Sequence, residues 1–186
     1  MRVVLVGGGM SVLAGESGAF IDEADFVARV NVFSVKPEFQ AHTGTKTDLW
    51  WVQSSSCKTV TAKKIKTLGV KTIAYVESVH IRRVVEPIAT QSGVRLYEHP
   101  MVRFQELWER LVIKPSSGMV CFDFLQKECG YDFIYTIGID GFTEKGAHYY
   151  DPSNMKPKQT GYTNAERGYI DEQIRLGRAK RLNEAI

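Results

Sequence analysis

The chain has 186 residues, 44% of them hydrophobic, which is enough to bury the core of a globular domain. Its net charge of +3 is too small to indicate nucleic-acid binding by itself. The first residues run from a short apolar stretch directly into glycines, a pattern that fits neither a signal peptide nor a membrane span. We therefore expect a soluble, cytoplasmic protein. No internal repeat or composition break divides the chain, and we predict a single domain over 1–186.

Apolar runs alternate with helical patterns along the first half of the chain. The predicted strands are 3–6, the second half of 22–33, 48–52, 70–76 and 94–97. The predicted helices are the first half of 22–33, 59–68 and 79–92. Gly69 is expected to end the second helix, and Pro87 to break or kink the third. The polar stretch 53–56 is predicted to be a loop after the strand at 48–52.

The second half continues the same alternation. We predict helices at 104–112 and at 116–127, the latter with Ser116 or Ser117 as N-cap, and a central strand at 133–139. A terminal helix is predicted at 166–182, with Ile170, Ile174 and Leu176 on its inner side. Strands alternating with helices are typical of an α/β fold, here a Rossmann-like parallel-sheet core flanked by helices.

The cysteines and lysines of the chain give weaker signals. Cys57, Cys121 and Cys129 lack CxxC spacing and a neighbouring histidine cluster, so we expect reduced thiols in or near the core and no zinc site. Basic side chains cluster in two places, at 58–71 and at 167–181. These clusters are either solvated helix faces, the commoner case, or a surface that meets an anionic acceptor or partner.

Three glycines follow the first predicted strand. Gly7, Gly8 and Gly9 allow the backbone to turn tightly and to approach a ligand closely. The run is not a dinucleotide fingerprint, because Val12 stands where GxGxxG needs glycine, and it lacks the lysine of a P-loop. On the glycines alone, a structural turn and a ligand-binding loop are equally supported.

Two later segments have a similar character. Ser116, Ser117 and Gly118 open a predicted helix, whose first amides can face an anion. His148 opens the aromatic loop 148–151 after the predicted strand at 133–139. A lone histidine is usually a surface or packing residue, but His148 is placed to reach a cleft, where it can donate a hydrogen bond to a leaving phosphate. The three segments together indicate a nucleotide-sugar site.

With these residues in view, the chain resembles glycosyltransferase family 29, the sialyltransferases, over most of its length. The likeness rests on Val4–Gly9, Ile21-Asp22, Asp25-Phe26-Val27, Arg29, Asn31 and Gly44–Thr47 for the long motif, on Pro115–Met119, Cys129 and Gly141-Phe142 for the short motif, and on His148–Asp151 for the third. The motifs occur in the family's order and keep its internal spacings.

The resemblance implies a sialyltransferase-like variant of the GT-A fold and a metal-independent, inverting transfer of a sialic-acid-like or other ulosonic sugar. The donor would be a CMP-sugar, with no further cofactor and no metal, and the acceptor a glycan or another hydroxyl compound. Nucleic acid is not expected as a partner. His148 would assist departure of CMP. The implied donor-binding residues are Gly7, Gly8, Gly9, Ser11, Asn31, Ser116, Ser117, Gly118 and Tyr149.

The chain departs from the family pattern at three positions. Gly8 stands where the family usually has asparagine, and the cysteine near Val3 that would pair with Cys129 in the family's disulfide is absent. The family's general base is a histidine five residues before a glutamate. If Glu166 is that glutamate, Gly161 (or Tyr162, one position off) replaces the histidine. The base is then His148, Asp151 or Glu166, or the protein is a non-catalytic module that binds CMP.

Overall fold

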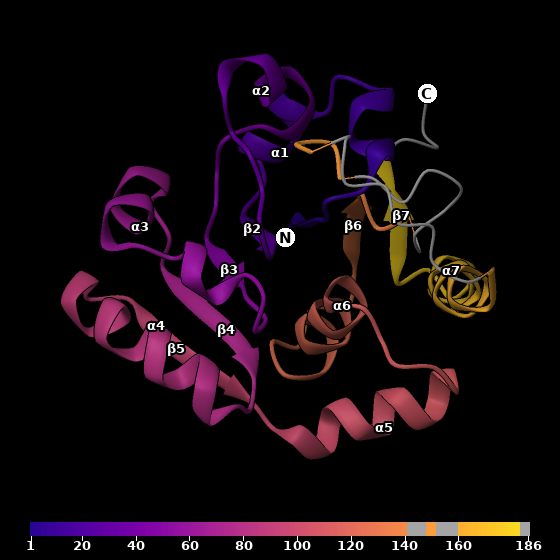
Figure 1. The fold of residues 1–186 in the computed structure, drawn as a ribbon. Helices are drawn as coiled ribbons and strands as arrows, with labels where there is room; N and C mark the ends of the chain where they lie inside the picture. Colours follow the sequence, from indigo (N-terminus) through magenta and orange to yellow (C-terminus); the bar gives the residue numbers. More distant parts are fainter. Residues whose placement is uncertain (141–147, 152–159, 183–186) are drawn as a thin grey trace.

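In a computed structural model, the chain forms one parallel sheet with helices on both faces (Figure 1). The structure describes residues 1–140, 148–151 and 160–182, with side chains in the last range from 164 onward. The strands are β1 Val3–Val6, β2 Phe26–Val30, β3 Leu49–Trp51, β4 Thr72–Val76, β5 Arg95–His99, β6 Ile134–Ile137 and β7 Ala179–Arg181. Their order across the sheet is β5-β4-β3-β2-β1-β6-β7. The predicted parallel α/β fold is confirmed.

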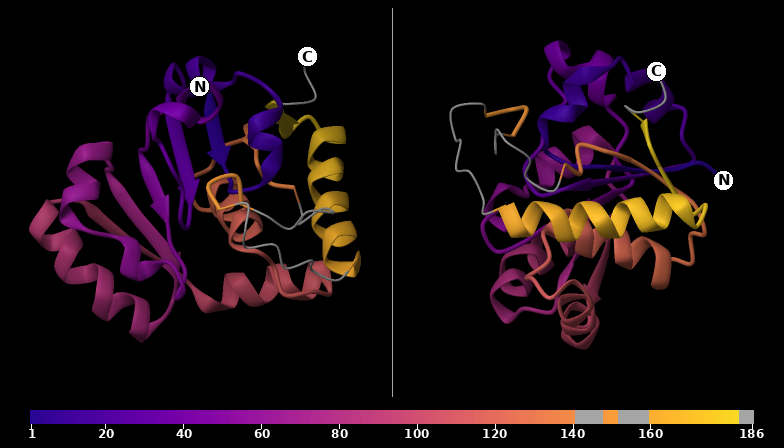
Figure 2. Two further views of the ribbon diagram at one scale, coloured as in Figure 1. Left: turned by 45° about the horizontal axis from the view of Figure 1, so that its top comes forward. Right: turned by 90° about the vertical axis from the view of Figure 1, so that its right-hand side faces the viewer.

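The helices divide between the two faces because alternate side chains of each strand point to opposite sides. The helical elements are η1 Met10–Ala14, α1 Gly18–Asp22, α2 Pro37–Thr43, η2 Cys57–Thr59, α3 Ala62–Leu68, α4 Val79–Ser92, α5 Met101–Leu111, α6 Ser117–Lys127 and α7 Thr160–Arg175. Helices α5, α6 and α7 pack with Val3 and Leu5 on one face (Figure 2). The other helices pack on the opposite face, where Val4 and Trp50 point. Among the described residues, no helix is both long and apolar enough to cross a membrane.

Most of the predicted elements are found, with instructive differences in α4 and near the C-terminus. Helix α4 continues through Pro87, which is exposed, so water can satisfy the carbonyl that loses its hydrogen bond. Helix α7 begins before the predicted start and ends at Arg175. Gly177, with φ of 70°, turns the chain into β7, which the sequence analysis missed. The prediction that Leu176 faces inward is wrong, since it is 44% exposed.

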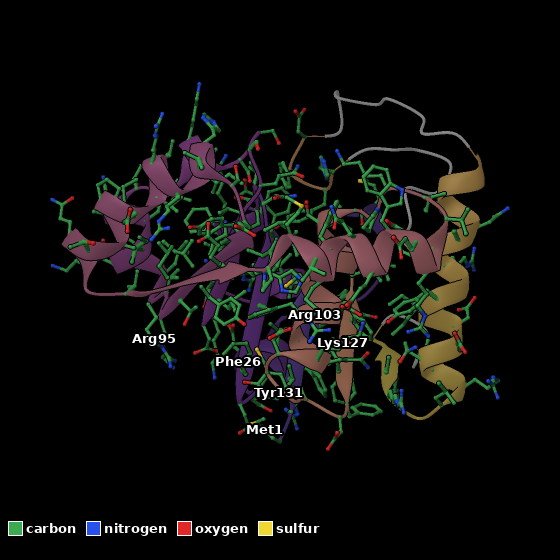
Figure 3. The ribbon with its side chains drawn as sticks, turned by 90° about the horizontal axis from the view of Figure 1, so that it is seen from below. Met1, Phe26, Arg95, Arg103, Lys127 and Tyr131 are labelled. Atoms are coloured by element: carbon green, nitrogen blue, oxygen red, sulfur yellow. The ribbon has the colours of Figure 1, made fainter. Side chains whose placement is uncertain are left out.

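Aromatic packing covers the amino end of β2. The rings of Phe26 and Tyr131 pack with their centroids 5.4 Å apart, near Met1 (Figure 3). Nearby, the Asp25 carboxylate accepts a hydrogen bond of 2.6 Å from the Arg2 backbone amide. The carboxyl ends of the strands, where open α/β sheets bind ligands, lie at the opposite side of the sheet.

His99 is a buried histidine at the end of β5. Its ring is 5.8 Å, between centroids, from both Trp51 and Phe124, and within the described part of the chain neither ring nitrogen has a hydrogen-bond partner. Burial lowers the pKa of His99, although Glu128 and Asp123 nearby act in the opposite direction. The unfolded chain therefore binds a proton more readily than the folded one, so stability is expected to fall as the pH drops below about 6.5, the pKa of free histidine.

This expectation is checked by measuring the free energy of unfolding from pH 7 down to pH 5 for the natural protein and for His99→Phe. Phenylalanine suits the apolar surroundings and does not titrate. The free energy of unfolding of the variant should therefore fall less between pH 7 and pH 5, and should stay close to that of the natural protein near pH 7. The neighbouring cations Arg103 and Lys127 also lower the pKa of His99, and they remain in the variant. An identical decline in both proteins would assign it to other groups.

Candidate functional site

Four neighbouring strands, β3, β2, β1 and β6, end at the same edge of the sheet because they are parallel. The chain passes from β1 to β2 on one side, but β6 lies on the other side of β1, so the strand order reverses there. Such switch points are where open α/β sheets bind ligands. The loops beginning at Gly7, Asn31, Val52 and Gly138 all start at this edge.

The glycine loop is shaped first by its contact with the loop after β6. The Gly7 amide donates to Ile137 O at 2.8 Å, and the Gly9 amide donates to Gly138 O at 2.9 Å. A Cβ atom on Gly7 would lie 2.2 Å from Gly138 O, so glycine is required for packing. The Gly8 amide, in contrast, has no acceptor among the described residues. The loop is therefore a tight turn that also leaves one backbone donor, the Gly8 amide, available to a ligand.

The N-terminus of α6 meets the glycine loop. Ser116 is the N-cap, with its Oγ accepting from the Met119 amide at 3.4 Å. Ser117 and Gly118 are the first helical residues, whose amides have no partner within the helix. Ideal Cβ positions on Gly118 and Gly7 lie 2.9 and 2.6 Å from the same atom, Ile139 Cδ1. The glycine loop and the N-terminus of α6 therefore both pack against the Ile139 side chain.

The third segment joins the same loop. His148 forms an antiparallel bridge with Gly9, and the Tyr149 amide donates to Gly8 O at 3.0 Å. His148 Nδ1 lies 3.4 Å from Gly8 O, and its ring stacks on Tyr150 with centroids 5.1 Å apart and planes 5° apart. If Nδ1 carries a proton and donates to Gly8 O, Nε2 is available to a ligand, as an acceptor in the neutral ring and as a donor in the protonated ring. The three segments that the sequence analysis singled out are therefore contiguous.

Tyr149 is placed in the interior, at 2% exposure. Its hydroxyl donates to Ser34 O and accepts from the Ser34 amide, both at 2.9 Å, and its ring packs edge-on against Phe39 with centroids 5.2 Å apart. These contacts use the polar atom of the side chain. The structure therefore supports a positioning role for Tyr149, as an anchor for the neighbouring His148, better than direct contact with a donor.

Asn31 adds a polar side chain from the end of β2. Its φ of 57° is left-handed, and its Oδ1 accepts a hydrogen bond of 3.0 Å from Ser56 Oγ. Trp50 Nε1 donates to the Asn31 carbonyl at 2.7 Å. None of the described hydrogen bonds uses the Asn31 side-chain NH2 group, which is free to bind a ligand.

Gln53 is a site residue that the sequence analysis missed. Its Oε1 accepts a hydrogen bond of 2.7 Å from Ser117 Oγ, and its backbone amide donates to Ser56 Oγ at 3.0 Å. Gln53 thus connects the N-terminus of α6 to the loop after β3. The available signal was the polar stretch at the carboxyl end of a predicted strand.

Ser11 closes the other side of the glycine loop. Its hydroxyl donates to Asp140, its backbone amide donates to Asp140 Oδ2 at 2.9 Å, and its Oγ accepts from the Gly138 amide at 3.2 Å. Asp140 is therefore committed to Ser11. Among the described residues, no group of three or more histidine, cysteine, aspartate or glutamate side chains is arranged to hold a metal ion.

Charged residues of the long motif hold the segments around the site in place. Arg29 is fully buried; its Nη2 donates to Thr43 O at 2.7 Å, and its Nε to Lys46 O and Thr47 Oγ1 at 3.0 Å. Burial lowers the pKa of Arg29 to about 10, so it stays charged at neutral pH. The Asp22 carboxylate accepts from the Lys46 amide at 2.8 Å. These contacts hold the loop before β3 against α1 and against the end of β2, which Asn31 follows.

Glu166 connects α7 to the same site. It is 1% exposed, and its Oε1 accepts the backbone amide of Ser116, the N-cap of α6. Gly161 and Tyr162 lie one turn earlier in α7, and their side chains are outside the described residues. The contact between Glu166 and Ser116 places the glutamate beside the short motif.

We expect Glu166→Ala to lower the free energy of unfolding by about 1–3 kcal/mol, because the Ser116 amide would lose its acceptor in a buried place. Glu166→Gln keeps an acceptor oxygen of the same shape and should cost less. Chemical denaturation of the two variants and the natural protein measures the difference. Equal losses for alanine and glutamine would show that the carboxylate charge, and not the hydrogen bond to Ser116, is what matters.

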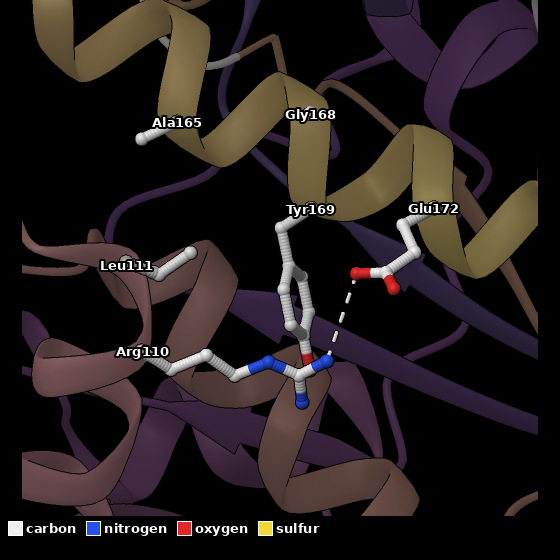
Figure 4. A pocket seen from close by; sticks show the side chains of 6 residues that line it. All are labelled: Arg110, Leu111, Ala165, Gly168, Tyr169 and Glu172. Atoms are coloured by element: carbon white, nitrogen blue, oxygen red, sulfur yellow. Dashed lines mark ion pairs between the residues drawn. The ribbon is translucent and has the colours of Figure 1, made fainter.

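A depression in the surface lies away from the glycine loop. It has a volume of about 220 Å³ and is lined by Arg110, Leu111, Ala165, Gly168, Tyr169 and Glu172, between α5 and α7 (Figure 4). The Arg110 guanidinium lies 4.7 Å from the centre of the Tyr169 ring and 3.6 Å from Glu172. Because these groups already have partners, we assign no ligand to this depression.

Most of the chain matches a known protein family. The family model described as glycosyltransferase family 29 (sialyltransferase) matches residues 1–120. The chain belongs to glycosyltransferase family 29. The match includes the glycine loop, Asn31, the Arg29 scaffold and the start of α6, while His148 and Glu166 lie beyond it.

Two solved structures share the fold of this family 29 chain. One is a mammalian sialyltransferase in complex with Gal-beta-1-3GalNAc-ortho-nitrophenol, with a TM-score of 0.69 and 20% identity over 98% of this chain and 69% of that one. The other is a mammalian sialyltransferase with a TM-score of 0.70 and 20% identity, over 98% of this chain and 68% of that one. No curated protein sequence matches the chain. At this identity the two structures confirm the fold alone.

Proposed function

We propose that this family 29 protein transfers a sialic-acid-like or other ulosonic sugar from a CMP-sugar to an acceptor hydroxyl, without a metal and with inversion. The observation that carries the proposal is the meeting of three donors at the switch point of the sheet. These are the Gly8 amide, the first amides of α6 and the side chain of His148. Family membership supplies the class of donor.

The chemistry of the leaving group fits these donors. When the bond from the sugar to phosphate breaks, negative charge develops on the CMP phosphate. A helix N-terminus and oriented amides stabilise such charge, and a histidine can donate a proton or a hydrogen bond to it. A monophosphate develops less charge than a diphosphate, so these groups suffice without a cation.

Asn31 and Gln53 extend the proposed donor site beyond the phosphate. The free NH2 group of Asn31 can donate to the nucleotide, while Gln53 positions the Ser117 hydroxyl. Ser11 and Tyr149 act indirectly, since their hydroxyls hold Asp140 and Ser34 respectively.

The proton of the acceptor hydroxyl needs a base. Glu166 is an unsuitable candidate, because it is buried and its carboxylate receives the Ser116 amide. Asp151 remains as the candidate, because a His148 ring that donates to the phosphate cannot also take the acceptor's proton in the same step; the two residues form an antiparallel bridge. An acceptor whose reacting hydroxyl is itself acidic would lose its proton with little help from a protein base.

The test is incubation of the protein with CMP-sialic acid and CMP-Kdo, with saccharide acceptors, and measurement of released CMP. Sugar transfer is then verified by the mass of the product. We expect release that depends on the acceptor. If neither donor releases CMP with any acceptor, the proposed transferase activity is wrong.

A second candidate is a non-catalytic module that binds CMP. It is favoured by one observation: Gly161 or Tyr162 stands where the family's histidine base would precede Glu166. Calorimetric titration with CMP separates the cases. Binding without turnover supports the module, and binding with turnover supports the transferase.

A further inference from the structure

The surface formed by η2 and α3 carries an unusual charge. Residues 49–76 contain five lysines and no aspartate or glutamate. The chain has 24 basic and 21 acidic residues in all, so everything outside this stretch is slightly negative. Lys71 pairs with Asp48 at 2.6 Å, but the other lysines have no ion pair among the described residues. We call Lys58, Lys63, Lys64 and Lys66 the lysine surface; all four are exposed.

The lysine surface adjoins the candidate site. The chain leaves β3 through Gln53, which holds Ser117, and enters η2, where Lys58 lies. Helix α3 follows directly, beside α4 and on the same part of the sheet (Figure 1). Lys64 Nζ lies 5.9 Å from the centre of the Trp50 ring, and Trp50 Nε1 donates to the Asn31 carbonyl. One tryptophan ring therefore separates a lysine from the proposed donor site.

We propose that the lysine surface binds the anionic groups of the acceptor, so that the acceptor is an acidic saccharide carrying carboxylate or phosphate groups. This inference rests on the proposed function. Nothing in the site itself uses these lysines, and four unpaired like charges repel one another unless anions approach. A saccharide with a few charges fits a patch this small, whereas a long nucleic acid would also meet the rest of the protein, which has 19 basic (24 − 5) and 21 acidic residues and so no net positive charge despite the basic cluster at 167–181.

The experiment compares two variants with the same loss of charge. One is Lys58→Gln with Lys63→Gln and Lys64→Gln; the other is Arg175→Gln with Arg178→Gln and Lys180→Gln, exposed residues near β7 at the opposite edge of the sheet. Each protein is titrated calorimetrically with sialyllactose, maltose 1-phosphate and lactose, at about 50 and about 200 mM salt. CMP is titrated in the same samples.

We expect the lysine variant to bind one or both acidic saccharides about tenfold more weakly than the natural protein, with less dependence on salt. The control variant and CMP binding should be unchanged. The two acidic sugars show whether carboxylate or phosphate is preferred.

Equal affinity for lactose and the acidic saccharides, or equal loss in both variants, would overturn the inference and leave the proposed function standing. Tighter binding of a single-stranded oligonucleotide of about 12 nucleotides, lost in the lysine variant, would also overturn it in favour of nucleic acid. Absence of CMP binding by the natural protein would instead count against the proposed function.

Discussion

His148→Ala is expected to slow release of CMP from a CMP-sugar by a factor of about 10²–10³, the usual contribution of a group that donates to a leaving phosphate. His148 lies at the glycine loop, with Nδ1 3.4 Å from Gly8 O, and alanine removes the nitrogen that would reach the phosphate. Affinity for CMP should change far less than the rate, because the amides of Gly8 and α6 remain. Initial rates of CMP release and calorimetric titration measure the two effects.

Two further variants make this result specific. His148→Phe keeps a ring that can stack on Tyr150, as His148 does, and should be as slow as alanine if the nitrogen matters. His80→Ala removes an exposed histidine at the start of α4 and should have no effect. A phenylalanine variant that retains the natural rate would show that the ring only supports the loop.

Arg29→Met is expected to lower the free energy of unfolding by about 3–5 kcal/mol, because several acceptors would each lose a donor at a cost of about 1–3 kcal/mol. Arg29 is fully buried, and methionine fills part of its volume but cannot donate to Thr43 O, Lys46 O and Thr47 Oγ1. Thr43 O and Thr47 Oγ1 would then stay buried without the donor that Arg29 supplies. Thermal and chemical denaturation measure the loss, which should appear as a large fall in Tm.

Arg29→Lys tests the geometry of the same network. Lysine keeps the charge, but its single ammonium cannot reproduce the planar guanidinium that reaches three acceptors. We therefore expect Arg29→Lys to lower the free energy of unfolding, but by less than Arg29→Met does. Arg2→Met is the surface control. Arg2 is half-exposed, pairs with Glu23 at 3.6 Å and lies 4.3 Å from the centre of the Phe20 ring, and loss of these surface contacts should cost about 1 kcal/mol or less. A loss for Arg29→Met no larger than for Arg2→Met would contradict the structural role of Arg29.

The sequence predicted the fold well where strands are apolar and helices have clear ends. Gly69 ends α3 in the left-handed conformation, and Ser116 caps α6, as expected from residue type. Strand β7 escaped prediction because Ala179–Arg181 is short and polar and depends on pairing with β6 for its identity. Helix α2 begins at Pro37, a helix-start signal that the sequence analysis did not use.

The site was predictable in outline but not in its internal contacts. The motifs indicated that Gly8, Ser117 and His148 belong together, and the fold brings their segments into contact. Sequence alone could not show that Tyr149 points inward to Ser34, or that Gln53 holds Ser117, because each depends on a partner far away in the chain. Residue type suggests chemistry, whereas burial and hydrogen-bond partners decide whether a side chain is available for it.

The position of strand β1 in the sheet has a consequence for folding during synthesis. It pairs with β2, which follows soon after it, and with β6, which comes late in the sequence. During synthesis, one edge of the fully apolar Val3–Val6 strand therefore stays open until β6 leaves the ribosome. An open apolar edge can add a strand from another chain. Chains interrupted before Ile134 should collect in aggregates, and slower synthesis at lower temperature should favour soluble protein.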